Sequence, residues 1–177
     1  MARSLGDNTA EDMGRITLNP LKHLDMFGSV ILPIFTYWTG GFIFGYAKPV
    51  PYNPLNLRDR KYGPVKVALA GPAANIVLAL LFGLCLRFLP DALGLTIFQN
   101  LLQGGVKINL VLAIFNLMPI PPLDGHWLLL TLLPNRFAAF KLFLVHYGIF
   151  IFLIFLFFIF PLFYPLINFL FKLIVGW

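Results

Sequence analysis

The chain has 177 residues, of which 59% are hydrophobic and only 11% are charged. Soluble domains are about 45–50% apolar and about 25% charged, and a globule of this size has too little interior to cover so much apolar surface. Composition therefore excludes a disordered chain and an ordinary soluble globule, and it indicates an integral membrane protein. The net charge of +6 does not indicate nucleic-acid binding, because the sequence offers no basic face with interleaved aromatic residues.

The first 26 residues are the most polar part of the chain and hold four of its seven acidic residues. Within them, residues 14–20 combine a short alternating pattern with a closing Asn19–Pro20 pair. This combination predicts a brief β-strand that ends in a turn.

Four apolar segments follow, and we expect them to cross or enter the membrane within one membrane domain, residues 1–177. The expected spans are residues 27–47, 67–89, 106–133 and 144–164. Pro33 and the Gly40–Gly41 pair predict that the first span is kinked or partly re-entrant. We interpret residues 92–105 as a weakly apolar connector or an interfacial helix, and the Phe-rich stretch 149–160 as lipid-facing. The basic stretch 58–66 is typical of a cytoplasmic loop.

These segments predict an all-α fold, a polytopic membrane helix bundle with a short β or extended segment near its N-terminus. The bundle contains one broken helix. Residues 116–125 read Asn-Leu-Met-Pro-Ile-Pro-Pro-Leu-Asp-Gly, and their three prolines remove amide donors and disrupt helix. Carbonyls freed at membrane depth require a protein-lined or watery cavity.

The broken helix places Asn116 and Asp124 in that cavity. A carboxylate in a membrane span is a candidate functional group, so Asp124 is a candidate metal ligand, proton relay or half of an ion pair. The alternative is that the segment is a surface loop and Asp124 only caps a helix that starts at Gly125. A small transporter that uses Asp124 as a proton relay also fits the broken helix.

The three histidines, His23, His126 and His146, do not by themselves make a metal site. Residues two apart on a helix point in different directions, so Asp124 and His126 are a weak pair of ligands. We interpret all three histidines as interfacial. The sequence contains no His-Glu-x-x-His motif, and Glu11 is its only glutamate.

Four segments together resemble the site-2 protease family of intramembrane zinc metalloproteases. They are Ala2–Ala10 running into Gly14–Pro20, then Ala47–Pro51 (Ala-Lys-Pro-Val-Pro), Ala70–Asn75 (Ala-Gly-Pro-Ala-Ala-Asn) and Phe115–Gly125. The proline-bracketed Asn…Asp-Gly segment is the most specific of the four. The resemblance covers residues 2 to about 130; beyond His126 only the hydropathy fits.

The resemblance implies a peptide-bond hydrolase with Zn²⁺ held by two histidines of an HExxH helix and by Asp124 as third ligand. It assigns Asn116 as a hydrogen-bond donor to the substrate carbonyl or the developing oxyanion. The stretch Lys48, Pro49, Val50 and Pro51 is a possible substrate-binding segment that pairs with an extended peptide, or else a rigid connector. The expected partners are membrane lipid and a transmembrane or membrane-associated peptide, and the expected location is the cell membrane, with several spans.

The sequence departs from the family because the HExxH helix, which precedes an Ala-Arg-x-Leu-Gly-Asp segment in family members, is absent. Two of three zinc ligands and the general base are then missing, and a lone carboxylate does not hold catalytic zinc. We expect the sequence to be an N-terminally truncated form of an active protease. The alternative is a catalytically inactive relative that binds hydrophobic helices.

Overall fold

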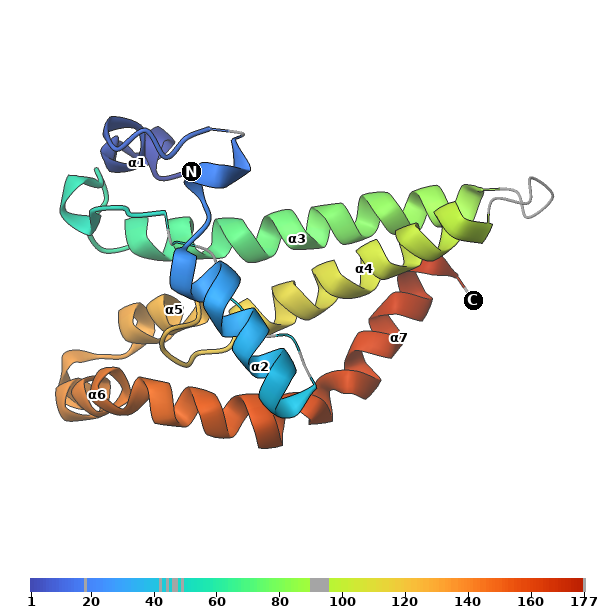
Figure 1. The fold of residues 1–177 in the computed structure, drawn as a ribbon. Coiled ribbons are helices and arrows are strands. Elements are labelled where there is room, and N and C mark those ends of the chain that lie inside the picture. Colours follow the sequence, from blue (N-terminus) through green and yellow to red (C-terminus); the bar gives the residue numbers. More distant parts are fainter. Residues whose placement is uncertain are drawn as a thin grey trace. The chain divides into compact units, whose positions relative to one another are not determined.

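A computed structural model gives the fold (Figure 1). It describes residues 1–17, 19–41, 43, 45, 48, 50–89 and 96–176. Over these ranges the chain forms helices, turns and irregular segments, without a β-strand. The chain divides into two compact units, Met1–Gly63 and Pro64–Trp177, which are described one at a time.

The first unit contains short helical pieces joined by irregular backbone. They are the 3₁₀ turns Arg3–Leu5, Pro20–Lys22 and Pro54–Asn56, helix α1 (Thr9–Asp12), the π-helical stretch Met26–Ile31 and helix α2 (Leu32–Gly40). Two of the 3₁₀ turns start with proline at the first helical position, where the missing N–H costs nothing. An asparagine precedes each of these turns, and its side chain accepts a backbone N–H two residues on.

The β-strand predicted within residues 14–20 is wrong. In the described part of this segment, local contacts occupy the backbone groups that a strand would pair. The Thr17 N–H bonds to the Arg15 carbonyl at 3.1 Å, and the Thr17 carbonyl lies 2.9 Å from Nε2 of His23. The turn predicted at Asn19–Pro20 is confirmed.

The first apolar segment forms a helix that is shorter than the predicted span. Continuous helix covers Met26–Gly40, and at 1.5 Å per residue it measures about 22 Å, less than the roughly 30 Å of a hydrocarbon core. It ends where Gly41 takes a φ of 67°, a left-handed conformation that glycine adopts readily. Most of residues 42–47 lie outside the described residues, so the end of the predicted span is not described.

The second unit consists of long apolar helices. They are α3 (Gly63–Phe88), α4 (Thr96–Asn116), α5 (Gly125–Leu132), α6 (Ala138–Ile154) and α7 (Tyr164–Val175). A 3₁₀ turn, Asn135–Phe137, precedes α6, and the stretches Phe155–Ile159 and Phe160–Phe163 join α6 to α7. Among the described residues, three helical segments are long and apolar enough to cross a membrane: α3, α4 and Asn135–Val175.

Two span boundaries differ from the sequence prediction. Helix α4 begins at Thr96, so most of the stretch interpreted as a connector is helical. Helix α4 then ends at Asn116, and α5 is a separate short helix rather than the end of one span. The 21 residues of α4 measure about 31 Å, which matches a hydrocarbon core.

Helices α3, α4 and α7 share one core, and Figure 1 shows α4 and α7 converging near the C-terminus. Its buried members are Ala79, Leu86, Leu102, Val106, Leu110, Ile167, Phe171 and Val175. Glycines allow close contact between these helices. A Cβ added at Gly83 of α3 would collide with Ile174 of α7, and one added at Gly105 of α4 would lie 2.7 Å from the Phe82 ring.

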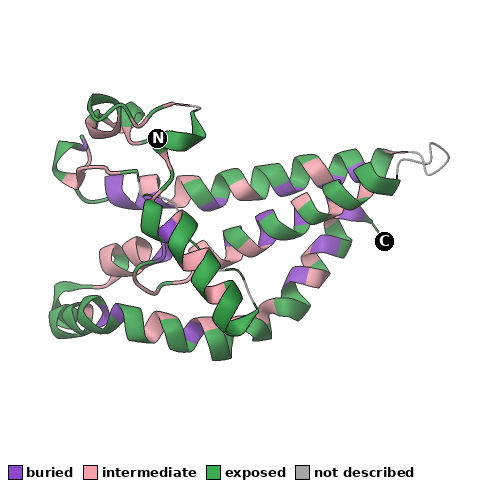
Figure 2. Cartoon of the chain, viewed as in Figure 1, coloured by how far each residue is buried: buried purple, intermediate pink, exposed green. Residues whose placement is uncertain are grey.

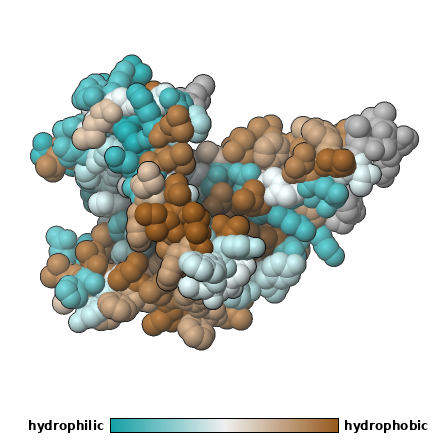
Figure 3. Space-filling model, in the orientation of Figure 1, coloured by the Kyte–Doolittle hydropathy of each residue, from teal (hydrophilic) through white to brown (hydrophobic). Residues whose placement is uncertain are grey.

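Most of the surface of these helices is apolar and exposed. Figure 2 shows exposed residues along much of α3 and α6, and Figure 3 shows hydrophobic side chains over the helices and hydrophilic ones on the N-terminal segment. Phe150, Phe157 and Phe158 are among the exposed residues, as predicted for a lipid-facing stretch. Phe155 of the same stretch is 2% exposed and instead packs inside. An exposed apolar surface of this extent is typical of a membrane or protein contact.

Candidate functional site

The loop between α4 and α5 is held in place by a glycine that leaves no room for a side chain. A Cβ added at Gly125 would collide with the Leu117 carbonyl oxygen and lie 2.6 Å from that of Met118. These are backbone atoms, which cannot rotate away. Gly125 therefore allows the proline-rich loop to fold back on the start of α5, and this fold sets the position of Asp124.

The Asp124 carboxylate lies against helix α3. Its Oδ2 atom would be 3.3 Å from a Cβ placed on Gly71. Gly71 belongs to the Ala-Gly-Pro-Ala-Ala-Asn segment, so two of the segments singled out in the sequence meet in space. Asn75 lies one helical turn after Gly71 and so on the same face of α3, where its side chain is half-buried.

Asp124 does not act as a helix cap. It occupies the N-cap position of α5, but its side chain makes no capping hydrogen bond and its backbone is helical, with φ −58° and ψ −36°. Across the described ranges, the structure gives its carboxylate no hydrogen-bond donor and no ion-pair partner. The carboxylate is half-buried. The capping interpretation is therefore wrong, and the carboxylate is available for another ligand.

Asn116 is the last residue of α4, eight positions before Asp124. Its Nδ2 donates to the Leu112 carbonyl at 3.0 Å, one helical turn back. An amide nitrogen carries two hydrogens, and this bond uses one of them. The side chain is half-buried, and it remains chemically able to donate to a second acceptor.

Helix α6 and an aromatic cluster support the same loop. A Cβ on Gly148 of α6 would lie 2.7 Å from Cβ of Pro121, so helix and loop are in close contact. Phe115, next to Asn116, packs edge-on against Phe160 with ring centroids 5.0 Å apart, and 6.0 Å from the Phe155 ring. Aromatic packing of this kind stabilises by about 0.5–1.5 kcal/mol per pair, and it fixes the end of α4.

Two of the three histidines predicted to be interfacial, His126 and His146, contact residues next to them in the chain. His126 places Nδ1 2.6 Å from the Leu123 carbonyl and its ring against Trp127. His146 lies exposed on α6 beside Tyr147. Among the residues that the structure describes, no three His, Cys, Asp or Glu side chains gather into a metal-binding group.

In the first unit, the structure holds Lys48 through its backbone. The Lys48 N–H donates to the His23 carbonyl at 2.9 Å, and the Lys48 carbonyl accepts from Nη2 of Arg15 at 2.9 Å. Val50 is 51% exposed, and Pro51 is half-buried. Pro49, the remaining member of the predicted substrate-binding set, lies outside the described residues.

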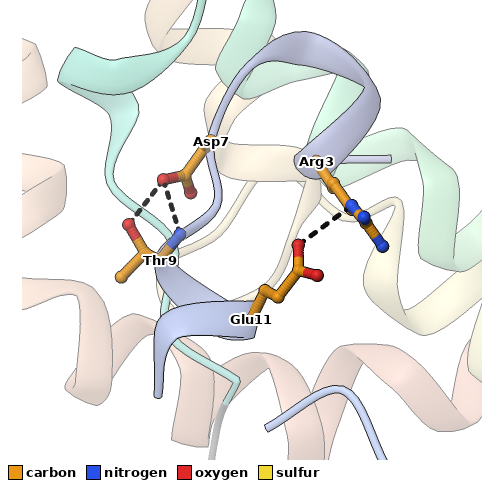
Figure 4. A network of polar contacts seen from close by, with 4 residues as sticks. All are labelled: Arg3, Asp7, Thr9 and Glu11. Atoms are coloured by element: carbon orange, nitrogen blue, oxygen red, sulfur yellow. Dashed lines mark hydrogen bonds and ion pairs between the residues drawn. The ribbon is translucent and has the colours of Figure 1, made fainter. Parts of the chain in front are cut away.

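Asp7 binds the residues that follow this stretch, Asn53 and Asn56. Its side chain is 2% exposed and accepts the Asn53 N–H at 2.9 Å, Nδ2 of Asn56 at 3.1 Å and the Thr9 hydroxyl at 2.5 Å. Burial alone raises the pKa of the Asp7 carboxyl, but these hydrogen bonds outweigh it and lower the pKa to about 2. Figure 4 shows Asp7 with Thr9, beside the exposed ion pair of Arg3 and Glu11, whose Nε and Oε2 are 3.0 Å apart.

Curated relatives identify the family. The chain is 36% identical to the "Putative zinc metalloprotease YwhC" of Bacillus subtilis over 161 residues, which are 87% of this chain and 70% of that protein. It is 37% identical to the "Putative zinc metalloprotease Rip2" of Mycolicibacterium smegmatis over 68% of this chain and 45% of the relative. The chain belongs to the site-2 protease family.

A third relative is the "Putative zinc metalloprotease MJ0611" of Methanocaldococcus jannaschii, 49% identical over 34% of the chain and 30% of that protein. No family model and no solved structure matches the chain. The chain therefore spans 70% of the Bacillus relative and less than half of the other two. The names of all three relatives specify zinc and proteolysis.

Of the three protein ligands in a catalytic zinc site, the described residues offer one candidate, Asp124. A carboxylate is an accepted zinc ligand in a three-ligand site, and Asp124 is half-buried with no competing donor among the described residues. Sequence reasoning missed Gly71 as the neighbour of Asp124 and missed Asp7 and Arg15 as backbone anchors. The signal for Gly71 was the run of small residues around it, which predicted close helix contact without naming the partner.

Proposed function

We propose that this chain forms part of a zinc-dependent intramembrane endopeptidase of the site-2 type, a multi-pass protein of the cell membrane. The supporting observation is the Asp124 carboxylate, which rests against Gly71 of α3 and makes no capping bond. Family membership and three apolar helices support the same conclusion.

In this proposal Asp124 is the third zinc ligand. The other two ligands and the general base come from a His-Glu-x-x-His helix encoded before Met1, since the present sequence contains no such motif. Zinc with an open coordination position supplies Lewis-acid activation of water for peptide hydrolysis. The Gly125 contact with Leu117 keeps Asp124 in place for this role.

Asn116 acts as the donor to the substrate carbonyl as negative charge develops on its oxygen. Its second amide hydrogen is available for this bond while the first stays bonded to Leu112. A fixed donor aimed at a developing oxyanion lowers the barrier because it needs no reorganisation during the reaction. Asn116 is fixed by its bond to α4 and by the packing of Phe115 beside it.

The substrate is a transmembrane or membrane-associated peptide that unwinds to an extended conformation before cleavage. A helix hides its backbone carbonyls in internal hydrogen bonds, so hydrolysis needs an opened segment. The stretch Lys48–Pro51 pairs with that segment by strand addition.

The direct test uses protein produced from the complete native gene, purified with zinc. The probe is a synthetic transmembrane peptide with an Asn-Pro pair in its apolar centre, reconstituted in liposomes and analysed by mass spectrometry. We expect cleavage that is abolished by 1,10-phenanthroline and reduced at least about 100-fold by Asp124→Asn. Asp12→Asn, which changes an exposed carboxylate of α1, is the matched control and retains activity. Cleavage that survives the chelator and Asp124→Asn would overturn the zinc mechanism.

The truncation has its own test. The intact mass of the protein isolated from its native membranes is expected to exceed 20.0 kDa by several kilodaltons, and its N-terminal sequence is expected to contain His-Glu-x-x-His. A native mass of 20.0 kDa would mean that the two histidines and the glutamate are absent, and catalysis would then be abandoned.

A further inference from the structure

We propose that Asn75 is a positioning residue for Asp124: its side-chain amide donates a hydrogen bond to one oxygen of the Asp124 carboxylate and leaves the other oxygen for zinc. The inference rests on the proposed proteolytic function and adds a residue of helix α3 to it. It is carried by two complementary polar groups that lie over the same turn of α3, and neither has a hydrogen-bond partner among the described residues.

Asn75 lies on the face of α3 that packs into the second unit. Buried residues recur every three or four positions along this face: Val65, Ala68, Pro72, Ala79 and Leu86. Asn75 falls three positions after Pro72 and four before Ala79, so its side chain points to the same side as theirs. Asn75 is nevertheless only half-buried, whereas Pro72 and Ala79 are almost completely covered. Room therefore remains beside the amide on an otherwise packed face.

The Asn75 amide differs from those of two other asparagines in the long helices of this unit. Asn109 donates to the Gly105 carbonyl at 2.8 Å, and Asn116 donates to the Leu112 carbonyl at 3.0 Å, each one helical turn back. Over the ranges that the structure describes, Asn75 makes no hydrogen bond of this kind or of any other. An unpaired amide in an apolar span is costly, and polar side chains of membrane helices therefore bond to neighbouring elements.

Asp124 supplies the acceptor that Asn75 lacks. The Asp124 Oδ2 atom rests at Gly71, one helical turn before Asn75. Side chains on a helix lean toward its N-terminus, so the Asn75 side chain covers the turn that contains Gly71. Cβ positions one turn apart are separated by about 5–6 Å, and the glycine has no side chain to stand between the two groups. An amide N–H donates and a carboxylate oxygen only accepts, so the two groups complement each other.

A donor on α3 fixes the carboxylate against a second helix. His126, which follows Asp124 on α5, already has its Nδ1 2.6 Å from the Leu123 carbonyl and its ring against Trp127. Carboxylates that bind a metal are commonly oriented by hydrogen bonds from such outer residues, and loss of one typically weakens metal binding. Asn75 acts through Asp124 and not on the substrate, so it is a positioning residue.

The first experiment tests the bond without zinc and without catalysis. Protein from the complete gene is made metal-free, and thermal unfolding in detergent is measured for the wild type, Asn75→Leu, Asp124→Leu and the double variant. Leucine keeps the branched shape of both side chains and removes their polar atoms. Asn100→Leu, alone and combined with Asp124→Leu, is the matched control, because Asn100 is exposed on α4. A second cycle with alanine at both positions covers the case in which leucine prevents folding.

We expect the effects of Asn75→Leu and Asp124→Leu on the unfolding temperature to be non-additive by about 3–6 °C, and those of Asn100→Leu and Asp124→Leu to add. A residue that only packs into the fold would give additive shifts. The second readout is zinc titration of folded protein. Asn75→Leu is expected to lower zinc affinity about 10-fold to 100-fold, and Asn100→Leu is expected to leave it unchanged.

The outcomes separate this inference from the proposed protease. Additive shifts overturn the hydrogen bond, and coupling with unchanged zinc affinity in Asn75→Leu overturns the positioning role. Either result leaves the proposed protease standing if Asp124→Leu still abolishes zinc binding and cleavage. Coupling between Asn75 and Asp124 in a protein that binds no zinc and cleaves no peptide keeps the bond and overturns the proposed protease.

Discussion

The carboxylate of Asp124 rests on the side of helix α3 at Gly71, where the absence of a side chain leaves it room. A methyl group at this position would lie 3.3 Å from Oδ2. The residue that we assign to zinc therefore depends for its position on a glycine 53 positions earlier in the chain. Three predictions concern this contact and the loop that carries Asp124, and a fourth concerns Asp7 in the first unit.

Gly71→Ala is expected to raise the stability of the protein while lowering its affinity for zinc. Alanine favours helix over glycine by about 0.5–1 kcal/mol, so the variant is expected to unfold at a slightly higher temperature. The new methyl group displaces Asp124 by a few tenths of an ångström, and we expect zinc affinity to fall about 10-fold to 100-fold. Metal titration and thermal unfolding in detergent measure the two effects. Gly104→Ala in α4, where a Cβ meets nothing within 4 Å, is the control and is expected to keep zinc affinity.

Gly125→Ala is expected to destabilise the protein as well as inactivate it. The added carbon collides with backbone atoms of Leu117 and Met118, which move only if the loop moves. Overpacking of this kind costs about 1–3 kcal/mol. Thermal unfolding measures the loss, again with Gly104→Ala as reference. A variant with normal stability and normal cleavage would show that the loop does not need its close approach to α5.

Asn116→Ala is expected to lower kcat by about 100-fold to 1,000-fold while changing KM little, because the donor acts on charge that develops in the transition state. Steady-state kinetics with the transmembrane peptide test this. The bond from Nδ2 to Leu112 lies at the end of α4 and contributes little to folding, so the variant is expected to fold. An equal increase in KM would instead indicate a role in peptide binding.

Asp7 is expected to make the first unit sensitive to acid only at very low pH. Its pKa in the folded protein, about 2, is below the ordinary value of 3.8, so its stabilising contribution is complete above pH of about 4 and is lost as pH falls toward 2. In wild-type protein, amide exchange at Asn53 is expected to accelerate across this window. In Asp7→Asn, amide exchange at Asn53 is expected to be faster at neutral pH. Below pH 4 its rate is expected to depend less on pH than in the wild-type protein. Identical profiles for the two proteins would contradict the assignment.

Local sequence patterns predicted much of the fold. Proline at 119, 121 and 122 broke the third apolar run where α4 ends and α5 begins, and the Asn19–Pro20 turn formed as its residues dictate. The strand within residues 14–20 did not form, because alternation alone supplies no partner strand, and the Arg15 side chain binds distant carbonyls instead.

Contacts between helices were not predictable in the same way. The weak apolarity of residues 92–105 made the start of α4 resemble a connector, and Gly104 and Gly105 within it disfavour helix. In the fold, Gly105 lies against the Phe82 ring, so close packing with α3 offsets the weak helix propensity. The contact between Gly71 and Asp124 has the same character, because one sequence shows the small residue and the carboxylate but not that they meet.

The packing of helix α7 limits how far the protein can be shortened at its C-terminus. Ile167, Phe171 and Val175 supply one wall of the core shared by α3 and α4, and Ile174 fills the gap at Gly83. A version that stops at Phe163 would leave Gly83 of α3 without its neighbour Ile174, and α3 and α4 would lose the helix that packs against both. The last 14 residues, which lie outside the proposed site, are therefore expected to hold α3 and α4 together.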